Sequence, residues 1–92
     1  MHYAVLVWWK ADADQQLVQE FLDEAPGLLA QAPFISCVHG SSLTTANKLS
    51  ADWGYVAEMT KEAREQWSPH PAHMELIERG KPIIGEIRTM TI

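Results

Sequence analysis

Residues His2 to Trp9 read HYAVLVWW, a run rich in β-branched and aromatic side chains without a turn-forming residue. Such a run predicts a β-strand, whose side chains alternate between two faces. One face would carry Ala4, Leu6 and Trp8, and the other Tyr3, Val5, Val7 and Trp9. A strand with one face in water would alternate apolar with polar residues. We therefore expect this strand to be buried on both sides.

The next segment, residues 11–31, has apolar positions at helical spacing and predicts a helix. Asp12 or Asp14 is the expected N-cap, because a short acidic side chain accepts a hydrogen bond from the first free N–H groups. We expect Pro26-Gly27 to kink or interrupt the last part. The expected buried stripe consists of Leu17, Phe21, Ala25 and Leu28.

The remaining chain predicts strands over residues 34–39, 52–59 and 85–92, with Gly40 closing the first and a polar loop over 41–50. A second helix covers 61–67, breaks at Ser68-Pro69 and resumes over 71–80. The order βαββαβ is that of an α+β, ferredoxin-like fold, an antiparallel four-stranded sheet with helices on one face. We expect one domain over residues 1–92. Because its helices can cover one sheet face only, we expect a second copy on the other, in a homodimer.

Composition narrows the class of protein. The chain has 92 residues, of which 47% are hydrophobic and 21% charged, as in ordinary globular domains. Its net charge is −5 and its basic residues are scattered, which argues against a nucleic-acid partner. We expect no membrane span and no signal peptide, because the sequence has no apolar run of about 20 residues and no cleavage-site pattern. The one cysteine favours a reducing, cytoplasmic location.

The string His70-Pro71-Ala72-His73 opens the last helix and offers the best candidate base. Proline is favoured at the first helical position, which makes His70 the N-cap and places His73 in the first turn. The positive end of the helix dipole there favours a neutral imidazole, which can accept a proton. The alternative is a helix start whose histidines only cap and hydrogen-bond.

Aromatic residues are the other conspicuous feature, with four tryptophans in so short a chain. An apolar pocket between helices and sheet is the predicted binding site for a small apolar or aromatic ligand. Its expected lining residues are Tyr3, Val5, Val7, Phe21, Trp53 and Trp67. Plain core packing is the alternative. We expect no metal and no cofactor, because the sequence has neither a compact ligand cluster nor a phosphate-binding glycine motif.

Several of these features resemble the stress-responsive A/B barrel (Dabb) family, in the family's order and over nearly the whole chain. They are Trp8-Trp9-Lys10 at the end of the first strand, Ala32-Pro33, Gly40, the strand over 52–59, and Trp67 three positions before His70-Pro71-Ala72-His73. The resemblance implies a dimeric α+β barrel, a homodimer in which two sheets pack face to face.

The family hosts several roles, and some members are similar to olivetolic acid cyclase, a cofactor-free polyketide cyclase. In such cyclases the second histidine of the motif is the base and a preceding tyrosine assists; here these positions hold His73 and Trp67. Indole donates a hydrogen bond but has no titratable hydroxyl. The cyclase's histidine on the first strand corresponds to Tyr3, beside His2, and that on the third corresponds to Trp53.

Two hypotheses therefore stay open. In the first, the chain is a small dimeric Dabb-like module whose function the sequence does not specify. In the second, it is a polyketide cyclase, an aldol-type enzyme or a binder of small aromatic ligands, with His73 as general base and His70 beside it. A cavity of a few hundred Å³ with His73 on its wall would favour the second hypothesis, and a solid core the first.

Overall fold

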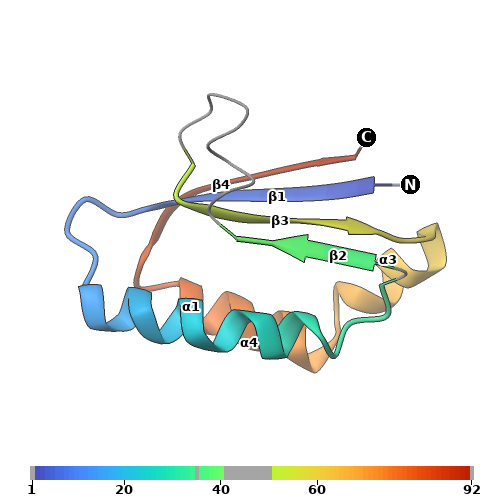
Figure 1. Cartoon of the computed structure of the whole chain (residues 1–92), viewed down its shortest axis with the longest axis horizontal. Coiled ribbons are helices and arrows are strands. Elements are labelled where there is room, and N and C mark those ends of the chain that lie inside the picture. The colour runs from blue at the N-terminus through green and yellow to red at the C-terminus, as the bar shows by residue number, and fades with distance from the viewer. Residues whose placement is uncertain (1, 35, 41–50, 92) are drawn as a thin grey trace.

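The computed structural model describes residues 2–34, 36–40 and 51–91. Its elements are β1 (His2–Trp9), α1 (Gln15–Leu29), β2 (Ser36–His39), β3 (Trp53–Glu58), α3 (Lys61–Trp67), α4 (Pro71–Gly80) and β4 (Ile84–Thr91). Within the described residues, the strands form one antiparallel sheet in the order β2-β3-β1-β4. The helices lie together on one side of this sheet (Figure 1). The predicted ferredoxin-like α+β fold is therefore confirmed.

Strand β1 occupies the interior of the sheet, where it pairs with β3 on one side and β4 on the other. Its middle residues are buried on both faces: Ala4 and Leu6 are each 5% exposed on one face, and Val7 is 1% exposed on the other. This confirms the burial predicted from the sequence. The burial is already present in a single chain.

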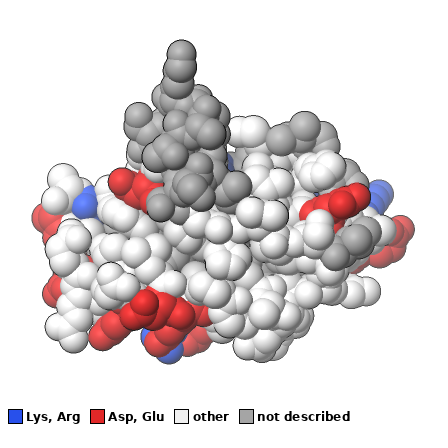
Figure 2. All heavy atoms as spheres, viewed as in Figure 1, with Lys and Arg blue, Asp and Glu red and all other residues white. Residues whose placement is uncertain are grey.

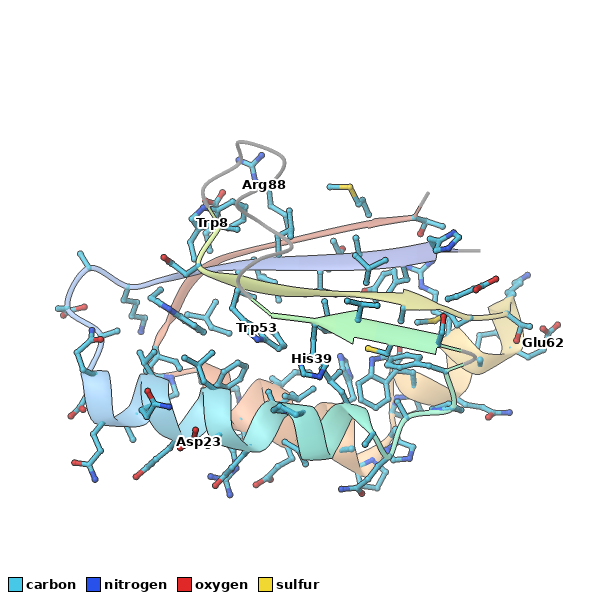
Figure 3. The ribbon with its side chains drawn as sticks, viewed as in Figure 1. Trp8, Asp23, His39, Trp53, Glu62 and Arg88 are labelled. Carbon is cyan, nitrogen blue, oxygen red and sulfur yellow. The ribbon has the colours of Figure 1, made fainter. Side chains whose placement is uncertain are left out.

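The two faces of the sheet differ in what covers them. The face toward the helices contributes Val5, Val7, Trp53 and Tyr55 to one hydrophobic core with α1 and α4. Figure 3 shows Trp53 and His39 pointing toward the helices, whereas Trp8 and Arg88 lie on the other side of the sheet. No described helix covers that second face, which we call the outer face.

Helix α1 differs from its prediction in three respects. It begins at Gln15, because the Asp14 side chain caps it by accepting from the N–H of Gln16 at 2.8 Å. It ends at Leu29, and it runs through Pro26-Gly27, so the expected interruption is wrong. Proline removes one hydrogen bond, but the next turn is kept by the bond from the Ala30 N–H to the Pro26 carbonyl at 3.0 Å.

The buried residues of α1 also differ from the predicted set at its first and last positions. Phe21 and Ala25 are buried as predicted. The stripe is completed by Val18 and Leu29 rather than by Leu17, which is 38% exposed, and Leu28, which is only partly buried. A helix with 3.6 residues per turn can present either set, and contact with the sheet and α4 selects one.

The break between the last two helices is confirmed, since α3 ends at Trp67 and α4 begins at Pro71. Strand boundaries differ by one or two residues, and Gly40 closes β2 with a positive φ of 134° that suits glycine. The predicted loop over residues 41–50 lies outside the described residues. In the part of the chain that is described, no helix is long and apolar enough to cross a membrane.

Two leucine variants of α1 test which face of this helix is buried. Leu29→Ala should lower the free energy of unfolding by about 2–5 kcal/mol, because Leu29 is 3% exposed. Leu17→Ala should cost less than about 1 kcal/mol. Urea denaturation followed by circular dichroism measures both, and equal losses would contradict the observed orientation of α1.

Candidate functional site

The turn between α3 and α4 positions both histidines of the motif. His70 is the N-cap of α4, and its Nδ1 accepts a hydrogen bond from the Ala72 N–H at 3.0 Å. Pro71 follows as the first helical residue, as predicted. The capping bond occupies the Nδ1 lone pair, so the His70 ring has a structural role in starting the helix.

His73 lies in the first turn of α4, and its Nδ1 is 2.8 Å from the Ser68 carbonyl oxygen. A carbonyl oxygen can only accept, so this contact assigns the proton of a neutral imidazole to Nδ1. The other ring nitrogen, Nε2, is then left with a free lone pair. The bend that joins the two helices thus orients His73 as a proton acceptor at Nε2.

A hollow lies between the helices and the sheet, and His73 is part of its wall. Its volume is about 90 Å³, well below the 300–1,000 Å³ usual for drug-sized ligands. An apolar protein cavity of about 150 Å³ holds benzene. The hollow opens between α4 and β4, because Ile77 and Ile87 line it and are 40% and 57% exposed. It can therefore accept a molecule of a few atoms, or one end of a longer molecule. His73 is on the wall as the second hypothesis requires, but the volume is below the few hundred Å³ that would favour that hypothesis.

The structure brings six of the predicted residues to this hollow: Tyr3, Val5, Val7, Phe21, Trp53 and His73. His70 and Trp67 are not among the described residues that line it. Trp67 is 1% exposed and lies against His73, with ring centres 5.0 Å apart. Trp67 therefore lies in the core beside His73, and it does not line the hollow.

Sequence reasoning missed the other lining residues, Tyr55, Leu76, Ile77, Ile84, Ile87 and Thr89. Part of the signal was available. Tyr55 lies two residues after Trp53 on one strand, so both share a face. Leu76 and Ile77 lie three and four residues after His73, which is the spacing of one helix face.

Among these residues, Tyr55 is hydrogen-bonded to Trp67. The indole Nε1–H of Trp67 donates to the Tyr55 hydroxyl oxygen over 3.3 Å, and both side chains are buried. Burial raises the pKa of Tyr55 far above its ordinary value near 10. Tyr55 therefore stays protonated across the physiological range, and its hydroxyl keeps a proton that it can donate.

The charged residues lie elsewhere. Figure 2 shows acidic side chains toward both ends of the molecule, and one group of them on the side where the helices lie. There Arg79 of α4 forms ion pairs with Glu75 on its own helix and with Glu24 on α1. Among the described residues, no three His, Cys, Asp or Glu side chains come together as a metal site.

We expect the buried phenol to make folding sensitive to alkaline pH. Above about pH 10 the unfolded chain ionises Tyr55 while the folded chain does not, so this contribution to stability is present below pH 10 and lost above it. Burial also raises the pKa of Cys37, with the same sign. Tyr55→Phe should flatten the fall in unfolding free energy between pH 9 and pH 11, measured by urea denaturation. An unchanged slope would contradict a buried, protonated Tyr55.

Comparison with known proteins shows the fold. No protein-family model matches the chain, and no curated protein matches it. The chain is similar to a dimeric ferredoxin-like protein of unknown function from Thermobifida fusca, with a TM-score of 0.78 and 18% identity over 97% of this chain and 85% of that one.

Two other solved structures extend the range of neighbours. A Dabb family protein with a ferredoxin-like fold from Mesorhizobium loti has a TM-score of 0.67 and 17% identity, over 97% of this chain and 90% of that one. A hydroxynitrile lyase from Passiflora edulis has a TM-score of 0.72 and 15% identity, over 97% of this chain and 87% of that one. The chain thus has the fold shared by a Dabb family protein, dimeric ferredoxin-like proteins and a lyase.

Proposed function

We propose that this chain is a Dabb-type protein that binds a small carbonyl compound in the hollow and removes a proton from it, with His73 as the base and without a cofactor. The observation that carries this proposal is the 2.8 Å contact between His73 Nδ1 and the Ser68 carbonyl. It leaves Nε2 as the accepting nitrogen of a ring that lines an otherwise largely apolar hollow.

The proposed step is a proton abstraction next to a carbonyl group. His73 Nε2 takes the proton, and the electron pair of the broken C–H bond moves into the carbonyl group, so that its oxygen becomes negatively charged. The imidazolium that forms keeps its Nδ1–H on the Ser68 carbonyl, which helps to stabilise it. The resulting enolate either regains a proton at carbon or attacks a second carbonyl, as in an aldol addition.

The size of the hollow supports a substrate of a few carbon atoms, or the carbonyl-bearing end of a longer one. A complete aromatic polyketide would exceed the 90 Å³ available. One solved structure with this fold is described as a hydroxynitrile lyase, so an enzyme can be built on the fold. Passive binding of the same compounds is the competing function, because the lining is mainly apolar.

Hydrogen exchange tests the base directly and does not require knowledge of the natural substrate. Butanone dissolved in D₂O with the protein should exchange the protons next to its carbonyl faster than in buffer alone, as followed by proton NMR. His73→Ala should lower the protein-catalysed rate by about 10²–10⁴-fold, or to the buffer rate if that is reached first.

The control is His39→Ala, which removes an exposed histidine that does not line the hollow. This variant should exchange butanone at the wild-type rate. Equal rates for wild type and His73→Ala would exclude His73 as the base. Butanone binding without any catalysed exchange would leave passive binding as the function.

We also propose that the chain acts as a homodimer through the outer face of the sheet. This face carries the buried Ala4 and Leu6 of β1, the half-buried Trp8, and two exposed apolar side chains, Val38 at 59% and Met90 at 41%. The neighbours from Thermobifida fusca and from Bacteroides fragilis are described as dimeric. A second copy would cover the apolar side chains that no described helix covers.

Met90→Glu should therefore convert the dimer into a monomer, because it places a charge within the proposed interface. Met74→Glu is the matched control, since Met74 is 48% exposed on α4, on the helical side, and this variant should remain dimeric. Sedimentation equilibrium at micromolar concentration measures both. A monomeric wild-type protein would rule out the dimer.

A further inference from the structure

We infer that the Tyr55 hydroxyl is the group in the hollow that donates a hydrogen bond to the ligand's oxygen, and that Trp67 is a positioning residue that turns this hydroxyl toward the ligand. The inference rests on the proposed function for the identity of the ligand class, a carbonyl compound. It adds to His73 a second polar group with a distinct role.

The direction of the hydrogen bond between the two side chains carries the inference. Indole nitrogen can donate but not accept, so at 3.3 Å the Trp67 Nε1–H must be the donor and the Tyr55 oxygen the acceptor. The Tyr55 proton therefore cannot point at Trp67. Among the described residues, no acceptor is recorded for that proton, and Tyr55 lines the hollow.

The surroundings hold Trp67 in place. Its ring is 1% exposed and packs edge-on against Phe34, with centres 5.0 Å apart. The His73 ring lies at the same distance in a tilted arrangement. One rigid indole thus touches two of the polar residues that line the hollow, Tyr55 on β3 and His73 on α4. A hydroxyl that accepts one hydrogen bond also donates a stronger one, because the two bonds polarise each other.

The two residues then have separate tasks. His73 accepts the proton from carbon, and Tyr55 donates a hydrogen bond to the oxygen on which negative charge develops. Donors placed at such an oxygen are among the largest contributions to catalysis. Trp67 has no titratable hydroxyl and does not line the hollow, so it acts on the ligand through the residues that it contacts, of which Tyr55 is the one it hydrogen-bonds.

Infrared spectroscopy of a bound carbonyl tests the hydrogen bond itself. Butanone labelled with ¹³C at the carbonyl is the probe, since its carbonyl stretch moves to lower wavenumber when it accepts a hydrogen bond. The stretch should lie lower when the probe is bound to wild type than to Tyr55→Phe. In Trp67→Phe it should be intermediate or broadened, because the hydroxyl is present but no longer oriented. Trp9→Phe is the matched control, a tryptophan outside the hollow lining, and should match wild type.

Hydrogen exchange of the same probe supplies a second readout. Tyr55→Phe should lower the catalysed rate by about 10²-fold, the usual effect of removing one such donor, and Trp67→Phe should lower it less. Should Tyr55→Phe fail to fold, as judged by circular dichroism, Trp67→Phe and Trp9→Phe still provide the comparison.

The outcomes separate this inference from the proposed function. If His73→Ala abolishes exchange while the carbonyl stretch of the bound probe stays lowered, both the proposed base and the Tyr55 assignment are supported. If wild type shows the lowered stretch without His73-dependent exchange, the base is wrong and the Tyr55 assignment stands. A stretch that is the same in wild type, Tyr55→Phe and Trp67→Phe, or the absence of any bound probe, overturns the inference.

Discussion

The position of β1 in the middle of the sheet is the constraint on which the rest of the structure depends. Its backbone pairs with two strands, and its side chains from Val5 to Val7 are buried. Because one face of β1 must be covered, α1 and α4 pack side by side across it, and the space that remains between these helices and the sheet is the hollow. The candidate site is thus a consequence of how α1 and α4 pack on the sheet.

The broken connection between α3 and α4 gives that hollow its imidazole, His73. Two imidazoles three residues apart have opposite hydrogen-bonding states: His70 accepts from the backbone at Nδ1, and His73 donates to it from the same atom. A continuous helix would bury the Ser68 carbonyl in its own hydrogen-bond ladder. The bend releases this carbonyl and so orients the ring of His73.

Much of the fold was predictable because it rests on local patterns. The apolar run of β1, the proline at the start of α4 and the capping side chain of His70 each act within a few residues. The rotated stripe of α1 was not predictable, since Leu17 and Val18 are equally apolar and the sheet decides which one is buried. The continuity of α1 through Pro26 likewise depends on the packing of Ala25 and Leu29, which outweighs a local breaking signal.

For the site, the sequence by itself determined that a histidine begins the first turn of a helix and that aromatic side chains gather on the strands facing it. Only the tertiary structure decided that Tyr55 on β3 meets Trp67 at the end of α3, and that Trp67 lies behind His73. Twelve residues separate Tyr55 from Trp67 along the chain. A hydrogen bond between side chains on a strand and on a helix depends on the register and packing of both elements, and no local pattern encodes that distance.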